Sequence, residues 1–342
     1  MTTTIKVQEN VPLAPYTTFH IGGPAQHFVI VTTIDELKEA VHFAKEHSLP
    51  VTVMSGGSNM LIADAGIPGL TIKIAIGGYT FEQTGQYEAI LRVNAGAALD
   101  DVVNECVNQG YWGLENLSGI PGSVGATPIQ NVGAYGVEVK SRITEVVAMN
   151  QDTLELRTFS NEECAFGYRM SFFKTDAGSR YIITSVSMSV SKIPTPHLQY
   201  ADLRRAFSDR DPSLRQIREE VIRIRSRKFP DWRIVGTAGS FFKNPRISVE
   251  RYEALKATHP DAPGFEDGPG VMKVPLGWII DKLLNLRGAR DGAVGTYENQ
   301  SLVLVNWGGA SAEEVERFAT FIETRVKEAT GIDIEREVRR YP

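Results

Sequence analysis

The first pattern that suggests chemistry is a glycine pair flanked by hydroxyl and amide side chains, Ser55-Gly56-Gly57-Ser58-Asn59-Met60. Two adjacent glycines let the backbone turn sharply and approach another group closely, because no Cβ intervenes. The N–H groups released by such a turn can line a concavity that binds an anion, and a pyrophosphate would suit it. Most Gly-Gly pairs are ordinary turns, so on local evidence alone we favour that simpler interpretation.

A second glycine-rich segment, residues 119–136, contains five glycines and two prolines but almost no charge. This composition excludes regular structure, while a solvated loop would be more polar. A buried loop must find partners for its N–H and C=O groups. A heteroaromatic cofactor with carbonyls and ring nitrogens would supply such partners.

A basic surface is expected on the helix that starts at Ser213. The usual explanation is a solvated face with Glu219 and Glu220 as ion-pair partners. The alternative is a phosphate site at a domain junction. The basic residues are Arg215, Arg218, Arg223, Arg225, Arg227 and Lys228.

Ser240 lies between Gly239 and two phenylalanines, which invites comparison with a hydrolase nucleophile. The G-x-S-x-G elbow is absent, because residue 242 is Phe, and nothing identifies a partner histidine. We therefore disfavour a serine hydrolase.

The elements around the first glycine pair form a predicted β-α-β unit. Residues 26–31 and 51–54 read as strands, and a helix between them opens with a Thr33–Glu36 capping box. Leu37, Ala40, Val41 and Ala44 form one apolar stripe along this helix. The glycine pair then follows the second strand, where nucleotides dock in such units. No G-x-G-x-x-G opens a helix here, so the pattern does not predict a Rossmann fold.

Further along, alternating and helical patterns predict a mixed chain with a candidate boundary at Gly77-Gly78. Short helices are expected after Ser160 and at 276–284, and a Ser311–Glu314 capping box opens a long final helix. The chain should then return as a strand over 332–339 and rejoin the middle domain. Other strands are expected at 69–74, 79–84, 90–94, 143–149, 154–159, 182–190 and 301–306, and other helices at 99–107 and 248–258.

Composition sets broad limits. The 342 residues suggest about two domains of roughly 150 residues each, and a 42% hydrophobic content is ordinary for a globular protein. A net charge of -5 gives no reason to expect nucleic acid or membrane partners. Cys106 and Cys164 read as reduced core thiols, and the six histidines form no ligand-spaced pair. The histidine spacing predicts no metal site. The N-terminus lacks an apolar leader, so we expect a cytoplasmic protein. We also expect a monomer.

With these stretches placed, the chain resembles the UDP-N-acetylenolpyruvoylglucosamine reductases, flavoenzymes of bacterial peptidoglycan synthesis, over essentially its full length. Each motif alone is weak, but five in the same order are specific. They are Ser55 to Asn59, Ile120 to Gly125 continuing through Asn131 to Gly136, Phe166-Gly167-Tyr168-Arg169-x-Ser171, Gly239 to Pro245, and Glu335-Arg336-Glu337-Val338.

The resemblance implies an α+β fold with a two-part FAD-binding region, similar to the PCMH or vanillyl-alcohol-oxidase type. It implies FAD-binding subdomains at 1–77 and at 78–228 plus 330–342, with an α+β substrate-binding domain inserted at 229–329. Tyr200 and its neighbours look like the subgroup with an extra loop, whose tyrosine closes over the substrate pyrophosphate. This chain ends at Pro342, whereas many members continue into a glycine-bearing tail, so we expect the tail strand to be held less firmly.

The implied reaction reduces UDP-N-acetylglucosamine enolpyruvate to UDP-N-acetylmuramate, with NADPH as donor and non-covalent FAD as carrier. Hydride from flavin N5 would add to the terminal enol-ether carbon, leaving negative charge beside a carboxylate. By resemblance, Arg169 holds that carboxylate, Glu337 polarises it or shares its proton, and Ser240 protonates the carbanion. Each also has a structural explanation: a buried ion pair, an edge-strand carboxylate and a turn hydroxyl.

The resemblance also assigns binding residues. Tyr135 would line the pocket near the flavin, and the UDP part would contact Tyr200, Lys228, Asn244 and Gln300. The implied FAD contacts are Ser55, Gly56, Gly57, Ser58, Asn59, Met60, Gly119, Ile120, Pro121, Gly122, Ser123, Gly125, Ala126 and Thr127.

Two rival functions can be distinguished. An FAD-linked oxidase or dehydrogenase of a small hydroxy acid would share the cofactor scaffold, but it would have no use for Lys228, Ser240 and Asn244. A non-catalytic nucleotide-sugar sensor would keep a UDP pocket but would not need the segment 119–136.

Overall fold

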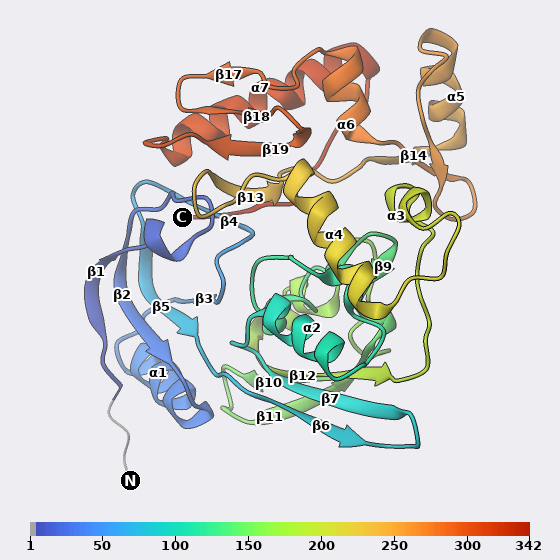
Figure 1. Cartoon of the computed structure of the whole chain (residues 1–342). Coiled ribbons are helices and arrows are strands. Elements are labelled where there is room, and N and C mark those ends of the chain that lie inside the picture. Colours follow the sequence, from blue (N-terminus) through green and yellow to red (C-terminus); the bar gives the residue numbers. More distant parts are fainter. Residues whose placement is uncertain (1–4) are drawn as a thin grey trace. The chain divides into compact units, whose positions relative to one another are not determined.

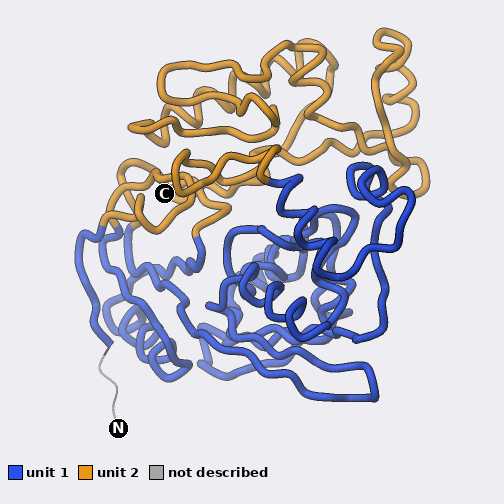
Figure 2. Tube along the Cα trace, in the orientation of Figure 1, with its two compact units in different colours: residues 1–11, 25–56, 68–225 blue, residues 12–24, 57–67, 226–342 orange. Residues whose placement is uncertain are grey.

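The computed structural model describes residues 5–342, which divide into two compact units (Figures 1 and 2). Among the described residues, unit 1 comprises 5–11, 25–56 and 68–225. Unit 2 comprises residues 12–24, 57–67 and 226–342. The chain therefore passes from one unit to the other inside the first glycine segment, between Gly56 and Gly57.

Unit 1 opens with a four-stranded sheet in the order β1-β2-β5-β3 (Figure 1). The short apolar run predicted before the glycine pair is β3, which pairs in parallel with β5. The strands are β1 (Gln8–Pro12), β2 (Pro24–Val31), β3 (Val51–Met54) and β5 (Ile67–Ile74).

Helix α1 (Ile34–Glu46) buries the predicted apolar stripe of Leu37, Ala40, Val41 and Ala44. The Thr33 side chain accepts a hydrogen bond from the Glu36 N–H at 3.1 Å, as expected of an N-cap. The Glu36 carboxylate, however, accepts from the N–H of Thr32 at 2.6 Å. Only half of the predicted capping box is therefore formed.

The second sheet of unit 1 is fully antiparallel, in the order β11-β10-β12-β7-β6. Val29 and Leu70 of the first sheet share one continuous hydrophobic core with Leu91 and Val146 of the second. The strands are β6 (Tyr79–Gln83), β7 (Glu88–Asn94), β10 (Ile143–Asn150), β11 (Leu156–Ser160) and β12 (Tyr181–Ser191).

Three helices complete unit 1: α2 (Leu99–Asn108), α3 (Ala201–Ala206) and most of α4 (Leu214–Lys228). The inward residues of α4 pack in a smaller core with Trp112, Tyr135 and Leu203. Two short strands, β8 (Gly133–Ala134) and β9 (Val137–Glu138), form a hairpin within this unit.

Unit 2 contains an antiparallel sheet in the order β13-β19-β18-β17 and the long helix α7 (Ala312–Thr330). The predicted capping box at Ser311 and Glu314 is complete. The sheet strands are β13 (Gly236–Ser240), β17 (Arg290–Asp291), β18 (Val294–Tyr297) and β19 (Gln300–Asn306). A three-stranded sheet has the order β14-β16-β15, with β14 (Arg246–Ser248), β15 (Phe265–Glu266), β16 (Val271–Lys273) and the adjoining α5 (Val249–Thr258).

Three local predictions need correction. Residues after Ser160 form turns rather than a helix, although Ser160 and Glu163 exchange the hydrogen bonds of a capping box. The predicted helix at 276–284 is a single α-turn, α6 (Leu276–Trp278), followed by a π-helical turn at Ile279–Leu283. The tail forms a strand only at β20 (Arg339–Tyr341).

The tail strand β20 pairs in parallel with β4 (Met60–Ile62) inside unit 2. The sequence analysis instead places residues 330–342 in one subdomain with residues 78–228. Because β4 directly follows the first glycine segment, this pairing ties the end of the chain to that segment. The mixture of helices and mostly antiparallel sheets agrees with the predicted α+β class.

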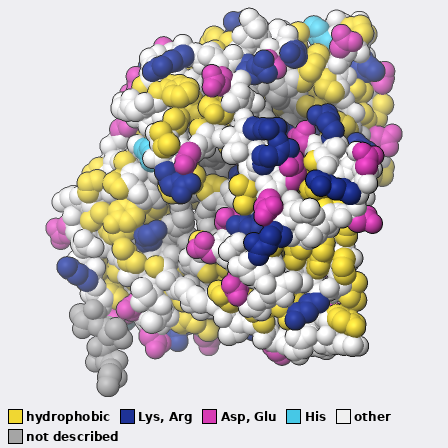
Figure 3. All heavy atoms as spheres, in the orientation of Figure 1, with side chains coloured by type: hydrophobic (Ala, Val, Ile, Leu, Met, Phe, Trp, Pro, Cys, Tyr) yellow, Lys and Arg dark blue, Asp and Glu magenta, His cyan; other side chains and the backbone are white. Residues whose placement is uncertain are grey.

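Within residues 5–342, no helix combines the length and the apolar character needed to cross a bilayer. On the face shown in Figure 3, basic and acidic side chains are interspersed.

Candidate active site

The two predicted cofactor segments touch in unit 1. A Cβ built on Gly56 would lie 2.6 Å from the Cα of Gly122, closer than real Cβ atoms approach. Gly122 itself has a φ of 112°, which favours glycine. Segments separated by more than 60 residues therefore meet backbone to backbone, and this contact requires a glycine at position 56.

Backbone hydrogen bonds tie the segment that starts at Gly122 to residues 95–99. Leu99 donates its N–H to the Gly122 carbonyl at 3.0 Å, and Gly125 donates to the Ala95 carbonyl at 2.9 Å. Ser123 is 4% exposed, yet its hydroxyl has no hydrogen-bond partner among residues 5–342. A buried hydroxyl without a partner is costly, so Ser123 fits a site completed by a polar ligand such as a flavin cofactor.

Other predicted cofactor residues form local hydrogen bonds or are partly buried. Ser55 donates its hydroxyl to the Ile74 carbonyl at 3.2 Å, and Thr127 donates to the Val124 carbonyl at 2.8 Å. Val124–Ala126 form a 3-10 turn, in which Ala126 is half-buried. Ile120 and Pro121 are also half-buried.

Both backbone polar groups of Gly119 are hydrogen-bonded to charged side chains. Its N–H donates to the Asp100 carboxylate at 2.6 Å, and its carbonyl accepts from Arg225 Nε at 3.0 Å. Arg218 forms a bidentate pair with Asp100 at 2.6 and 3.1 Å. Two arginines of the expected solvated face therefore pair with groups of unit 1.

The surroundings of Gly119 shift the pKa values of both charged groups that bind it. Burial raises the pKa of the Asp100 carboxyl, but the bonds from Arg218 and Gly119 outweigh it, leaving that pKa below its ordinary value. Burial lowers the pKa of Arg225, partly offset by Tyr135 and Asp100.

A group of three left-handed, non-glycine residues lies around the end of the same segment. Asn131, Tyr135 and Arg169 have φ values of 47°, 50° and 52°. Such conformations cost roughly 1–3 kcal/mol each and concentrate at functional sites. Arg169 donates to the carbonyls of Asn131 and Gly133 at 3.5 and 3.3 Å, so the predicted carboxylate-binding arginine contacts the predicted cofactor segment.

Tyr135 and Tyr200, both predicted to face the substrate, contact each other in unit 1. Their rings are edge to face with centroids 5.1 Å apart. The buried Asn116 donates to the carbonyls of Tyr135 and His197 at 2.8 and 2.9 Å, and so joins the two segments that carry the tyrosines. Sequence reasoning missed Asn116, because nothing in its local pattern marks it.

In unit 2, the second half of the first glycine segment contacts the tail. The Asn59 amide donates to the Glu337 carbonyl at 3.2 Å, and Arg339 returns its N–H to the Asn59 carbonyl at 3.2 Å. Gly57 packs against the Tyr16 carbonyl, where a Cβ would lie only 2.1 Å away. Ser58 is half-buried, and Met60 begins β4.

Ser240 and Glu337 lie on neighbouring segments of unit 2. β13 has an irregular register between Thr237 and Ser240, where Gly239 has a φ of 78°. Such bulges redirect the following side chain. Phe241 is buried, and its carbonyl accepts the Glu337 N–H at 2.8 Å. The residue after the predicted acid is thus hydrogen-bonded to the backbone of the predicted carboxylate residue.

The predicted UDP contacts in unit 2 lie partly around α6. The Asn244 side chain accepts from the Leu276 N–H at 3.0 Å, and Gln300 Oε1 lies 3.3 Å from a Cβ built on Gly277. Lys228 is the last residue of α4. Across residues 5–342, no three His, Cys, Asp or Glu side chains gather as metal ligands.

Two family models match parts of this chain. Residues 25–156 match the model "FAD binding domain", and residues 231–341 match "UDP-N-acetylenolpyruvoylglucosamine reductase, C-terminal domain".

Full-length relatives carry the same name. The UDP-N-acetylenolpyruvoylglucosamine reductase of Pseudomonas syringae pv. syringae is 37% identical, covering 98% of this chain and 99% of its own. That of Bdellovibrio bacteriovorus is 39% identical, covering 98% and 100%. The crystal structure of UDP-N-acetylenolpyruvylglucosamine reductase from Thermus caldophilus has a TM-score of 0.70 and 27% identity, covering 99% of this chain and 100% of its own.

Proposed function

Because the chain belongs to the UDP-N-acetylenolpyruvoylglucosamine reductase family, we propose that it uses NADPH to reduce UDP-N-acetylglucosamine enolpyruvate to UDP-N-acetylmuramate. The chain is an FAD-dependent oxidoreductase. The proposal also covers NADPH as the nicotinamide donor, the roles of the residues discussed below and a cytoplasmic location. The observation that carries the residue assignment is the backbone pairing that holds Ser240 and Glu337 on adjacent segments.

We assign cofactor binding to the segments that meet at Gly56 and Gly122. The partnerless Ser123 hydroxyl gives this region an unfilled hydrogen-bonding capacity. When bound, FAD would carry a hydride from NADPH to the enolpyruvyl double bond.

Arg169 binds the substrate carboxylate in this proposal. Its bonds to two carbonyls, at 3.5 and 3.3 Å, exceed the range of about 2.7–3.2 Å usual for N–H···O bonds. A bidentate carboxylate would be a stronger acceptor than these carbonyls. The left-handed backbone at Arg169 is consistent with a side chain positioned for function rather than for stability.

Ser240 donates the proton that completes the reduction, and Glu337 acts on the carboxylate beside the reacting carbon. The reaction adds one hydride and one proton across the double bond, so a group other than the hydride carrier must supply the proton. Serine is a weak acid, but a carbanion with enolate character is a strong base, and fixed geometry supplies much of the remaining rate.

The UDP part is assigned to Lys228, Asn244 and Gln300, with Tyr200 over the pyrophosphate and Tyr135 beside it. Lys228 gives a compact positive charge suited to phosphate. Asn244 and Gln300, both beside α6, supply amide groups for a polar ligand.

Two anaerobic additions to the purified yellow protein test this function. NADPH should bleach the flavin absorbance, and UDP-N-acetylglucosamine enolpyruvate should then restore it and yield a product heavier by two hydrogens. Bleaching by a small 2-hydroxy acid, with no response to the enolpyruvyl compound, would instead identify the rival oxidase. A colourless protein that binds UDP sugars would identify the sensor.

A further inference from the structure

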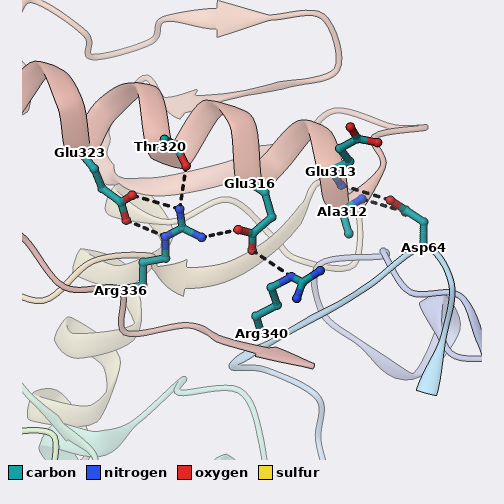
Figure 4. A network of polar contacts seen from close by, with 8 residues as sticks. All are labelled: Asp64, Ala312, Glu313, Glu316, Thr320, Glu323, Arg336 and Arg340. Atoms are coloured by element: carbon teal, nitrogen blue, oxygen red, sulfur yellow. Dashed lines mark hydrogen bonds and ion pairs between the residues drawn. The ribbon is translucent and has the colours of Figure 1, made fainter. Parts of the chain in front are cut away.

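The guanidinium of Arg336, the residue before Glu337, is bound by three side chains of helix α7 (Figure 4). Its guanidinium makes a bidentate pair with Glu323 at 2.6 and 3.0 Å, contacts Thr320 at 3.0 Å and pairs with Glu316. The α7 carboxylates raise the pKa of Arg336 further above its ordinary value. This network ties the tail to the longest helix of unit 2.

The backbone next to Arg336 is also held by hydrogen bonds within unit 2, because the Glu337 N–H donates to the Phe241 carbonyl at 2.8 Å and the Glu337 carbonyl accepts from the Asn59 amide at 3.2 Å. Residues 332–338 form no named strand, and β20 begins only at Arg339. A single bridge pairs Arg336 with Phe242. The N–H of Lys243 donates to the Glu335 carbonyl at 2.9 Å, and its side chain pairs with the Glu335 carboxylate at 2.6 Å.

We infer that Arg336 is a positioning residue that sets the register of the tail and thereby presents Glu337 to its site. Arg336 is fixed on α7 and Glu335 is paired with Lys243, so the two residues that lead into Glu337 are both anchored within unit 2. The inference rests on the proposed role of Glu337.

The charge pattern also opposes the wrong registers. Arg336 is flanked by Glu335 and Glu337. A slip of one residue in either direction would place a glutamate against Glu316 and Glu323, and three carboxylates would repel one another. Attraction in one register and repulsion in its neighbours therefore act together.

The test uses the flavin-loaded full-length enzyme with Arg336→Met and Arg336→Lys. Hydrogen exchange by mass spectrometry should show the peptide covering 332–341 exchanging about tenfold faster in Arg336→Met. Arg336→Lys, which keeps the charge but not the fork, should be intermediate. Reoxidation of reduced enzyme by the enolpyruvyl substrate should slow by about tenfold, since small misplacements reduce rates strongly. The KM for that substrate and bleaching by NADPH should change less than about threefold.

A double-mutant cycle and a matched control separate positioning from general damage. Glu316→Gln with Glu323→Gln should loosen the tail as Arg336→Met does, and combining all three changes should add little more. Arg325→Met is the control, because Arg325 lies on the same helix, where it pairs with Glu328 at 3.8 Å and lies over the ring of Phe321. It should leave tail exchange and both half-reactions unchanged.

Glu337→Gln distinguishes failure of this inference from failure of the proposed function. If Glu337→Gln is reoxidised at the parental rate, that carboxylate has no catalytic role, whatever the result for Arg336→Met. If Glu337→Gln is slow but Arg336→Met keeps parental tail exchange or parental reoxidation, the positioning role is overturned.

Discussion

At the scale of single residues, Gly56 illustrates how one absent side chain can shape a site. Its backbone lies against Gly122, and a Cβ there would be 2.6 Å from the Gly122 Cα. Gly56 has no left-handed φ, so contact rather than backbone strain is what demands glycine. The local sequence favoured an ordinary turn, because the partner segment is distant along the chain.

Gly56→Ala should therefore displace the segment 119–127 and yield protein with little bound flavin. The measurement is the ratio of flavin to protein absorbance after purification, with circular dichroism to verify folding. Gly77→Ala is the matched control, because the nearest atom to a Cβ there is 4.0 Å away and its φ is ordinary. Full flavin content in Gly56→Ala would show that the meeting of these segments does not form the cofactor site.

At the scale of elements, helix α2 anchors the start of segment 119–136 through its first turn. Asp100 accepts the Gly119 N–H and the Arg218 guanidinium, which together hold its pKa below the ordinary value. Since the folded pKa is depressed, this contribution to stability is present above the unfolded pKa and is lost as pH falls through the folded value.

Asp100→Asn should lower the free energy of unfolding by about 1–2 kcal/mol at pH 7, a moderate figure because the carboxylate is partly exposed. The difference from the parent should shrink below about pH 4, where the carboxylate becomes protonated in the unfolded chain. Urea unfolding at several pH values measures this. Asp101→Asn, exposed in the same helical turn, should be nearly neutral. An equal loss in both variants would point to the helix dipole instead.

Elements with strong local signals were predictable from sequence. The stripe of α1, the capping box of α7 and the strand before the glycine pair all agree with the structure. Residues 160–163 were mispredicted because a capping-box pattern also suits an isolated turn. The tail was predicted as one strand over 332–339, but its pairing depends on β4, nearly 280 residues away.

At the scale of the whole molecule, the candidate catalytic residues come from both compact units. Arg169 belongs to unit 1, whereas Ser240 and Glu337 belong to unit 2. No periodicity or spacing could relate residues so far apart in sequence, so the catalytic roles proposed for them rest on the resemblance to a family. Asn116, Asp100 and Arg336 were missed because their importance depends on long-range contacts that a single sequence does not display.

The central claim, that Ser240 supplies the proton, is tested most directly by stopped-flow absorbance of each half-reaction. Ser240→Ala should still bleach with NADPH at close to the parental rate, because proton donation has no part in that step. Its reoxidation by UDP-N-acetylglucosamine enolpyruvate should slow by more than about a hundredfold. Ser240→Cys, which keeps a transferable proton of lower pKa, should recover part of that rate. Parental reoxidation in Ser240→Ala would contradict the account and assign the proton to another group.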